Sequence, residues 1–301
     1  MIVLSLFDGI SCGRLALERA GIPVEKYYAS EIDKYAIQIS QKNYPDNIQL
    51  GDVTKWRLWD IDWSSIDLLI GGSPCQTFSN AGTRTGFDGK SRLFYTYLEI
   101  LNHLKLINPN IKFLLENVKM KKKWEDTISE CLGVKPIFIN SSLVSAQHRE
   151  RLYWCNWKIE QPQDKHIALK DILLNDIPEK YFMNYEFECL NNNKKVYAIV
   201  KMNGYRSSKE VYNPEYKCAT IMCDGNGGNL VKKVITNGRL RKLTPVEYER
   251  LQTLPDNWTD CCSDSRRYSA IGNGWTVDVI AHIFSSINQL KEEQLDLLDI
   301  C

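Results

Sequence analysis

Short apolar runs that alternate with helical stretches constrain the fold of this chain more than any other feature. Residues 66–70 and 111–115 are almost continuously apolar, as expected for parallel strands covered by helices on both faces. Repeated units of this kind predict an α/β fold with a doubly wound, mostly parallel sheet. The predicted strands are 2–6, 27–30, 66–70, 111–115, 137–140 and 151–155, and the predicted helices are 11–20, 36–42 and 95–106.

The pattern changes near Trp157, and this change predicts a second, smaller domain. From about Lys158 to Gly238 the chain is rich in Asn, Tyr and Lys and contains a glycine-rich run at 224–229, which is typical of a loop. A helix is predicted over 244–251, with a threonine cap, proline at its first position and glutamate at its third. We therefore expect a main domain of residues 1–157 plus 239–301 and a small domain of residues 158–238.

The small domain is locally basic, although the net charge of the whole chain is only +1. Residues 189–245 hold eleven Lys or Arg and three Asp or Glu, a local charge of +8. A surface of this kind can neutralise several phosphates of a nucleic acid. An ordinary solvated charged face is the alternative interpretation.

A glycine turn after the first predicted strand indicates a nucleoside site. Gly9 and Gly13 allow a tight turn and close approach of the backbone to a ligand. The fingerprint G-x-G-x-x-G is absent, which argues against a dinucleotide. Glu31 follows the next strand, where an acid can hold ribose hydroxyls, and Asp52 can accept from an adenine amino group. An adenosine without phosphates is consistent with S-adenosylmethionine, although either acid taken singly is better explained as a helix cap.

A cysteine and a carboxylic acid follow two of the apolar runs. Cys75 comes after a tight turn at the end of 66–70, and Glu116 follows 111–115. Open parallel sheets bind ligands at the carboxyl ends of their strands. A nucleophile and an acid there suit a reaction that adds sulfur to a ring and protonates the ring elsewhere. A buried inert thiol is the alternative for Cys75.

Taken in order, these motifs resemble the DNA (cytosine-5)-methyltransferase family in its stand-alone prokaryotic or phage form. The motifs that carry the resemblance along most of the chain are Phe7-Asp8-Gly9, Glu31, Asp52, Pro74-Cys75-Gln76, Glu116-Asn117-Val118, Gln147-His148-Arg149-Glu150-Arg151, Arg241-Lys242-Leu243-Thr244-Pro245 and Gly272-Asn273-Gly274-Trp275. The resemblance implies a Rossmann-like methyltransferase fold with a target-recognition domain at 158–238. It also implies S-adenosylmethionine as cofactor, S-adenosylhomocysteine as product and double-stranded DNA as partner.

The resemblance also assigns roles to residues. The Cys75 thiolate would add to carbon 6 of a flipped-out cytosine, Glu116 would hydrogen-bond ring nitrogen 3, and an arginine would hold the ring oxygen. The expected catalytic residues are Cys75, Gln76, Glu116, Asn117, Arg149 and Arg151. The expected cofactor-binding residues are Phe7, Asp8, Gly9, Ser11, Cys12, Gly13, Glu31, Ile32, Asp52, Val53, Pro74, Leu93, Asn273 and Trp275. The expected DNA-binding residues are Ser79, Arg84, Thr220, Gly225, Gly227, Arg239 and Arg241.

The cysteine content and the hydropathy of the chain indicate its cellular compartment. Ten scattered cysteines in a chain without a signal peptide predict reduced thiols in a cytoplasm, of a prokaryote or a phage-infected cell. The spacing of Cys218, Cys223, Cys261 and Cys262 fits no common zinc site, so no metal is expected. No apolar run approaches the ~20 residues that span a bilayer. We expect a monomer, and a cognate restriction endonuclease stays open as a partner.

Other functions remain open alternatives. One branch of the same family modifies a tRNA cytosine, but the basic small domain favours duplex DNA. A catalytically silent DNA-binding partner of the same fold is disfavoured by the presence of Cys75, Glu116 and the two arginines. An oxidoreductase is disfavoured by the missing phosphate-binding fingerprint.

Overall fold

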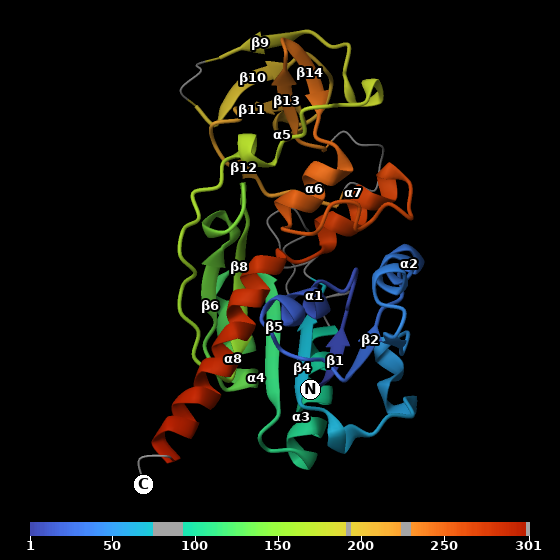
Figure 1. Ribbon diagram of the computed structural model, residues 1–301, viewed down its shortest axis with the longest axis vertical. Coiled ribbons are helices and arrows are strands. Elements are labelled where there is room, and N and C mark those ends of the chain that lie inside the picture. Colours follow the sequence, from blue (N-terminus) through green and yellow to red (C-terminus); the bar gives the residue numbers. More distant parts are fainter. Residues whose placement is uncertain (75–92, 191–193, 224–229, 299–301) are drawn as a thin grey trace. The chain divides into compact units, whose positions relative to one another are not determined.

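The computed structural model describes residues 1–74, 93–190, 194–223 and 230–298, with only the backbone for 288–298. The chain divides into two compact units. The first unit comprises Met1–Ile139, Glu150–Gln161 and Asp278–Cys301, and the second comprises Asn140–Arg149 and Pro162–Val277. Each unit has its own sheet (Figure 1).

The first unit is built on a seven-stranded sheet with the order β3-β2-β1-β4-β5-β8-β6. Its strands β1 to β5 pair in parallel, and β8 pairs antiparallel with β5. Leu68, Leu69 and Ile70 are all fully buried; because consecutive strand residues point to opposite faces, both faces of the sheet are covered. The predicted α/β fold is therefore confirmed. The strands are β1 (Ile2–Leu6), β2 (Lys26–Ser30), β3 (Ile48–Gln49), β4 (Leu68–Gly72), β5 (Lys112–Val118), β6 (Ile137–Asn140) and β8 (Glu150–Cys155).

Capping residues mark the start of α2 and the end of α4 in this unit. The Asp33 side chain accepts hydrogen bonds from Tyr35 N and Ala36 N and so caps α2, while Gly133, with φ of 75°, ends α4 in the left-handed conformation that favours glycine. Phe94 and Tyr97 of α3 are fully buried in one core with strand residues such as Leu69. The helices are α1 (Cys12–Arg19), α2 (Lys34–Asn43), α3 (Leu93–Ile107), α4 (Lys122–Leu132) and α8 (Val277–Leu298).

The second unit has a five-stranded sheet, ordered β14-β13-β11-β10-β9, and a two-stranded pair of β12 with β7. Asn237 and Gly238 join β13 to β14 with φ of 51° and 75°, the signature of a two-residue type I′ hairpin turn. The strands are β7 (Gln147–His148), β9 (Phe187–Cys189), β10 (Val196–Val200), β11 (Glu210–Tyr212), β12 (Cys218–Ala219), β13 (Lys233–Thr236) and β14 (Arg239–Lys242). The helices are α5 (Arg206–Lys209), α6 (Pro245–Leu251) and α7 (Asp264–Asn273).

The division into units differs from the predicted domain boundaries. A boundary at residues 238 and 239 would cut the β13–β14 hairpin, whose register pairs Thr236 with Arg239. Thr244 caps α6 as predicted, with Glu247 completing the capping box. Residues 239–277 therefore group with the second unit, as does the segment 140–149.

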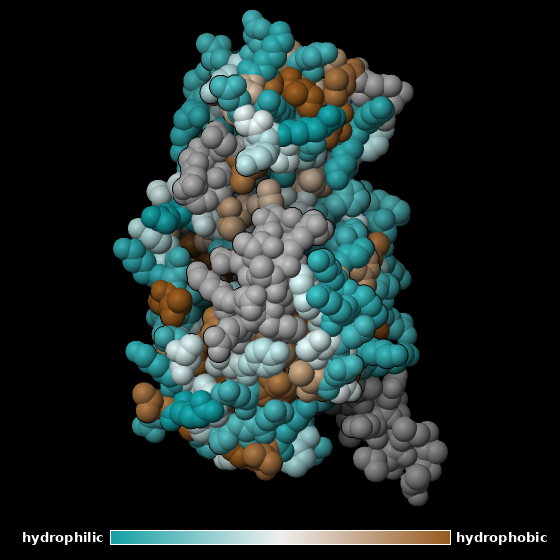
Figure 2. Space-filling model, turned by 180° about the vertical axis from the view of Figure 1, so that it is seen from behind, coloured by the Kyte–Doolittle hydropathy of each residue, from teal (hydrophilic) through white to brown (hydrophobic). Residues whose placement is uncertain are grey.

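Exposed large apolar side chains are scattered along the described part of the chain. The face drawn in Figure 2 is mainly hydrophilic, with small separate groups of apolar side chains. Ile32 is one of the exposed apolar residues, at 75% exposure, and it adjoins Glu31 of the predicted nucleoside site. In the part of the chain that the structure describes, no helix is both long and apolar enough to cross a membrane.

Candidate active site

Glu116 and Arg151 form an ion pair on two neighbouring strands of the first unit. Strands β5 and β8 run antiparallel, with Val118 opposite Arg151 and Glu116 opposite Tyr153. Arg151 Nε lies 2.8 Å from Glu116 Oε1, and the two side chains are only 14% and 11% exposed. A carboxyl group and a guanidinium held side by side, with little water around them, can bind the polar edge of a planar ring.

Asn117 connects this pair to the chain that leads to Cys75. Asn117 Nδ2 donates to Ser73 O at 3.2 Å and to Ser73 Oγ at 3.0 Å, and both residues are buried. Ser73 directly follows β4, where Gly72 lies opposite Glu116. These bonds fix the main chain just before Pro74, and the catalytic role of Asn117 stays a prediction. Ser73 was not predicted from the sequence. Its only recognisable feature there is that it is a polar residue immediately before Pro74.

Four of the predicted site residues lie outside the described part of the chain. They are Cys75, Gln76, Ser79 and Arg84. Gly71, which precedes them, is described, and a Cβ added there would lie 3.1 Å from Leu6 O and 3.2 Å from the Tyr97 ring. The close packing of strand on strand and helix at this point therefore favours glycine.

Arg149 is not placed as predicted. Its guanidinium is buried in the second unit, where it donates to Ile221 O at 3.2 Å, Gly272 O at 3.2 Å and Gly274 O at 2.9 Å. The predicted contact with a cytosine ring oxygen is therefore corrected to a structural role. Arg149 and Arg151 are two residues apart, which in one continuous strand would put both side chains on the same face. They do not share a strand, because β7 ends at His148 and β8 begins at Glu150.

Gln147 has a similar structural role. Its Nε2 donates to Leu251 O at 2.7 Å and Gln252 Oε1 at 2.9 Å, and its Oε1 accepts from Ile221 N at 3.3 Å. The first glycine of the motif Gly272-Asn273-Gly274-Trp275 has a packing reason. A Cβ added at Gly272 would lie 2.5 Å from Cys223 N, so a larger residue does not fit there. Asn273 is exposed and Trp275 is half-buried in the second unit, and their cofactor role stays a prediction.

The predicted nucleoside loop is held in an unusual backbone conformation. Phe7, Gly9 and Ser11 all have left-handed φ values, of 57°, 60° and 58°, which for Phe7 is a strained conformation typical of functional sites. The Asp8 carboxylate accepts from Ser5 Oγ, Ser11 Oγ and Tyr27 OH at 2.6 to 2.7 Å. Burial raises the pKa of Asp8, and these three hydroxyl bonds oppose the rise.

Glu31 and Asp52 both cap local main chain, yet each keeps acceptor capacity. Glu31 Oε2 accepts from Gly9 N at 2.9 Å, and Oε1 accepts from Ile32 N and Asp33 N at 2.7 and 2.9 Å. Asp52 Oδ1 accepts from Thr54 N and Thr54 Oγ1, bonds that lower the pKa of Asp52. Because a carboxylate offers about four acceptor sites, both can still accept from a hydroxyl or amino group. With exposed Ile32 as an apolar cover, these two acceptors fit the hydroxyl and amino groups of a nucleoside.

Other predicted cofactor residues are less accessible. Ser11 is fully buried and Cys12 is 3% exposed, and the Ser11 hydroxyl is bonded to Asp8 and Ser40. A cofactor contact from residues 11–13 would therefore use their main chain. Val53 is also buried, whereas Pro74 and Leu93 are half-buried.

The predicted DNA contacts need one correction. Arg241 is 0% exposed, and its guanidinium forms two bonds of 2.8 Å to Glu247; its predicted contact with DNA is replaced by a structural role. Arg239 is exposed, pairs with Glu179 and lies 4.0 Å from the Phe182 ring centroid. Thr220 Oγ1 donates to His148 O. Gly225 and Gly227 lie outside the described residues.

The basic surface of the small domain is smaller than its composition predicts. Lys232, Lys233 and Arg241 are all at least 97% buried. Lys201 and Arg239 pair with Glu186 and Glu179. Composition counts these charges fully, but burial and pairing remove most of their field from the surface.

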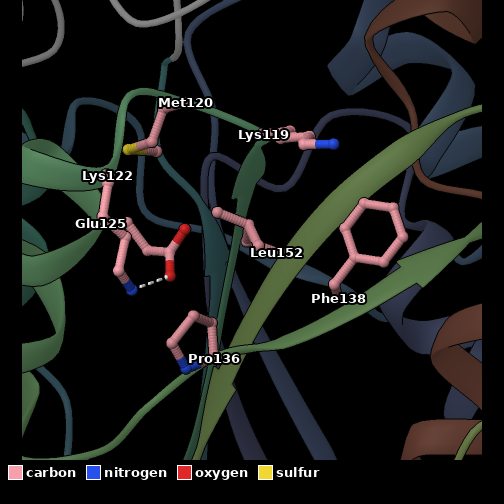
Figure 3. Close-up of a pocket in the computed structure, with 7 residues that line it drawn as sticks. All are labelled: Lys119, Met120, Lys122, Glu125, Pro136, Phe138 and Leu152. Atoms are coloured by element: carbon pink, nitrogen blue, oxygen red, sulfur yellow. Dashed lines mark hydrogen bonds and ion pairs between the residues drawn. The ribbon is translucent and has the colours of Figure 1, made fainter.

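A pocket lies beside the strands that carry Glu116 and Arg151. Its volume is about 310 Å³, and Figure 3 shows Leu152 between Met120 and Phe138, with the Lys122–Glu125 pair at one side. Lys119, which also lines it, pairs with Glu150 at 3.4 Å. Among the residues that the structure describes, no predicted catalytic or cofactor residue lines this pocket.

Comparison with known proteins places these features in a family. A family model described as C-5 cytosine-specific DNA methylase matches residues 1–289. The chain is 32% identical to the Type II methyltransferase M.NlaX of Neisseria lactamica, covering 93% of this chain and 94% of that protein. It is 29% identical to the Type II methyltransferase M1.ScrFI of Lactococcus lactis subsp. cremoris, covering 99% and 78%.

The fold is also similar to solved structures. One from Escherichia coli, described as a DNA modification methyltransferase encoded within a prophage, has a TM-score of 0.68 and 20% identity. The likeness covers 97% of this chain and 99% of that one, and at this identity it concerns the fold alone.

Proposed function

Because the chain belongs to the C-5 cytosine-specific DNA methylase family and is thus a DNA (cytosine-5)-methyltransferase, we propose that it transfers a methyl group from S-adenosylmethionine to carbon 5 of cytosine in duplex DNA. The observation that carries the proposal is the Glu116–Arg151 pair, which Asn117 joins to the chain leading to Cys75. The proposed setting is a bacterial or phage-infected cytoplasm, where a restriction endonuclease would be the partner of a modification enzyme.

The proposed chemistry starts from the poor reactivity of the base. Carbon 5 of cytosine is a weak nucleophile, and addition of the Cys75 thiolate to carbon 6 makes it enamine-like. Glu116 would hydrogen-bond ring nitrogen 3, and Arg151 would bind the ring oxygen, so the adduct forms where its charge is stabilised. Loss of the proton from carbon 5 after methylation then expels the thiolate and restores the ring.

The first unit supplies residues that suit the cofactor. Glu31 would accept from the ribose hydroxyls, Asp52 from the adenine amino group, and Ile32 would cover the ring. The bound cofactor supplies the activated methyl group. The loop around Gly9 would lie against the cofactor, because Glu31 fixes Gly9 N and Asp8 fixes Ser11.

The substrate base must leave the helix for this chemistry. Carbon 6 of a stacked cytosine is out of reach of a side chain, and methyltransferases solve this by flipping the base into a pocket. We assign reading of a short DNA sequence to the second unit, in line with the recognition role expected of residues 158–238. Thr220 and Arg239 stay candidate DNA contacts.

A plasmid methylation assay tests the proposal. The chain and its Cys75→Ala and Arg151→Met variants would be expressed in a methylation-deficient bacterial host, with Arg57→Met as control, since Arg57 pairs with Glu99 on the surface of the same unit. Bisulfite sequencing should find protected cytosines in one short motif for the wild type and the control, and none for Cys75→Ala. A folded wild type that binds S-adenosylmethionine but protects no cytosine would contradict the proposal, and methylation of tRNA instead would identify RNA as the substrate.

A further inference from the structure

Five cations at the surface of the second unit are paired with carboxylates of the same unit. The pairs are Lys170–Glu215, Lys180–Asp264, Lys201–Glu186, Arg239–Glu179 and Arg250–Asp256. A cation beside a carboxylate contributes little to the electrostatic field at a distance. An anionic partner of this unit is therefore bound best by a surface cation that has no acid beside it.

Arg206, the first residue of the short helix α5, is such a cation. Its side chain is exposed, and within the described residues its guanidinium forms no ion pair and no hydrogen bond. Glu210, the acid nearest to it in the sequence, instead accepts from Tyr212 OH at 2.7 Å. Lys209, three residues after Arg206 and so on the same side of the helix, also has no carboxylate partner among the described residues. The positive charge of α5 therefore stays available to a ligand.

The main chain of α5 (Figure 1) is fixed from its buried side. Ser208 is only 4% exposed, and its Oγ and N both donate to Tyr205 O, at 2.7 and 3.0 Å. The buried ammonium of Lys233 in β13 donates to Ser208 O at 2.7 Å. Gly204 makes the turn into α5 with φ of 129°, and a Cβ there would lie 2.8 Å from Ser208 Oγ. Exposed side chains on a main chain that is already ordered lose less entropy when they bind a partner.

An exposed tyrosine and a hollow adjoin this cation. Tyr205, directly before Arg206, is 84% exposed. The residues just before it help to line a hollow of about 730 Å³, formed by Tyr185, Lys201, Met202 and Asn203. Tyrosine and arginine side chains are enriched where proteins bind partners, because the ring offers a large rigid contact area and the guanidinium binds oxyanions. An unpaired arginine beside an exposed ring and a concave surface indicates a polyanionic partner.

We propose that Tyr205 and Arg206 contact the DNA substrate, with Arg206 on a backbone phosphate and Tyr205 against the adjoining sugar or base edge. The inference rests on the proposed function for the identity of the partner, but its geometry belongs to the second unit alone. The planar guanidinium can donate to both free oxygens of a phosphodiester. A contact of this kind sets the position and orientation of the duplex.

The experiment compares the salt dependence of DNA binding. Fluorescence anisotropy would give the Kd for duplex DNA over a range of salt concentrations for the wild type, Arg206→Met and Tyr205→Ala. Lys170→Met is the matched control, because it removes one charge from an exposed cation of the same unit that is paired with Glu215. All three positions are exposed, so the variants should fold, and circular dichroism and thermal unfolding check this.

The two variants should differ in how salt affects them. Arg206→Met removes one phosphate contact, so the slope of log K against log salt should become less steep by about 0.9, with roughly tenfold weaker binding at low salt. Tyr205→Ala removes contact area but no charge, so binding should weaken about fivefold with an unchanged slope. Lys170→Met should match the wild type in both Kd and slope.

The outcomes separate this inference from the proposed function. An unchanged slope in folded Arg206→Met overturns the inference, and so does an equal reduction in Lys170→Met, which would show a general effect of charge. An unchanged Kd for Tyr205→Ala overturns the part assigned to the ring. A slope that depends on Arg206 in a protein that fails to methylate DNA supports the contact and contradicts the enzymatic proposal. Binding that depends on Arg206 with tRNA alone overturns the assignment to DNA.

Discussion

Arg149 and Arg151 are two positions apart, yet their guanidinium groups have different surroundings. Arg149 donates to main-chain carbonyls of the second unit, whereas Arg151 faces Glu116 in the first. The sequence could predict that one of them serves a site, because both match one motif. It could not predict which, because the break between β7 and β8 is a tertiary feature with no local signal.

The two arginines should respond differently to substitution. Arg151→Met removes a donor to the reacting ring, so we expect kcat/KM for DNA methylation to fall by roughly 10²–10³ with a small change in stability. Arg149→Met leaves buried carbonyls without donors, so the free energy of unfolding should fall by about 2–4 kcal/mol. Urea unfolding and incorporation of labelled methyl groups measure the two effects. A stable but inactive Arg149→Met protein would return Arg149 to the catalytic site.

Asp256 gives a pH-dependent test at the same scale. Arg250 binds its carboxylate through two hydrogen bonds, which lower the pKa of Asp256 below the value of 3.8 expected in the unfolded chain. The stabilisation is therefore present above that pH and is lost as the pH falls through the folded value. Asp256→Asn should be less stable than the wild type at pH 7, by no more than about 1 kcal/mol for so exposed a pair. The difference should vanish in strong acid, and a constant difference from pH 7 to pH 2 in thermal unfolding would contradict this.

At the scale of elements, the apolar periods predicted most strands and helices. Runs such as 66–70 work well because both faces of a parallel strand are buried, and this leaves a continuous apolar signal. Boundaries were less predictable. Strand β5 continues through Asn117 and Val118 because β8 pairs with it there, and a partner that arrives from later in the chain has no local signature. Helix α6 was predictable in detail because its capping box is entirely local.

The ion pair that anchors α6 to β14 allows a test of the corrected role of Arg241. Arg241 and Glu247 are fully buried and share two bonds of 2.8 Å. Removing one partner leaves the other charge buried alone, so Arg241→Met should lower the free energy of unfolding by about 3–5 kcal/mol. The combined Arg241→Met/Glu247→Gln variant should recover part of that loss, because the glutamine amide oxygen still accepts from Thr244 N while the unpaired charge is removed.

The same variants report on DNA. Because the double variant restores part of the stability without restoring the charge, its salt slope for DNA binding should equal that of the wild type. A slope reduced by about 0.9 in the folded double variant would show that Arg241 contacts a phosphate after all.

At the scale of the whole molecule, the two units divide the expected work. Glu31 and Asp52 of the nucleoside site belong to the first unit, while the described candidate DNA contacts Thr220 and Arg239 belong to the second. Composition suggested this division, since residues 189–245 are basic. Composition overstated the positive charge at the surface of the second unit, because it cannot reveal that Lys233 and Arg241 are buried and bonded within the protein.

This division predicts that cofactor and DNA binding can be weakened separately. Asp52→Ala removes an acceptor, so the Kd for S-adenosylmethionine should rise about tenfold, and the lost cap should cost about 1 kcal/mol of stability. The salt slope for DNA should be unchanged. Isothermal titration calorimetry measures the first effect and anisotropy the second. A variant with weaker DNA binding and normal cofactor binding would contradict the assignment.

The hydrogen bonds of Gln147 and Arg149 to main-chain oxygens affect which sequence changes this protein can accept during evolution. Carbonyl oxygens of Leu251, Ile221, Gly272 and Gly274 are present whatever side chains those positions carry, apart from the glycine that close packing demands at 272. Hydrogen bonds to main-chain carbonyls therefore do not restrict which side chains those positions carry. Descendants could therefore exchange one target site for another by changing side chains of the second unit, while keeping these internal bonds of that unit unaltered.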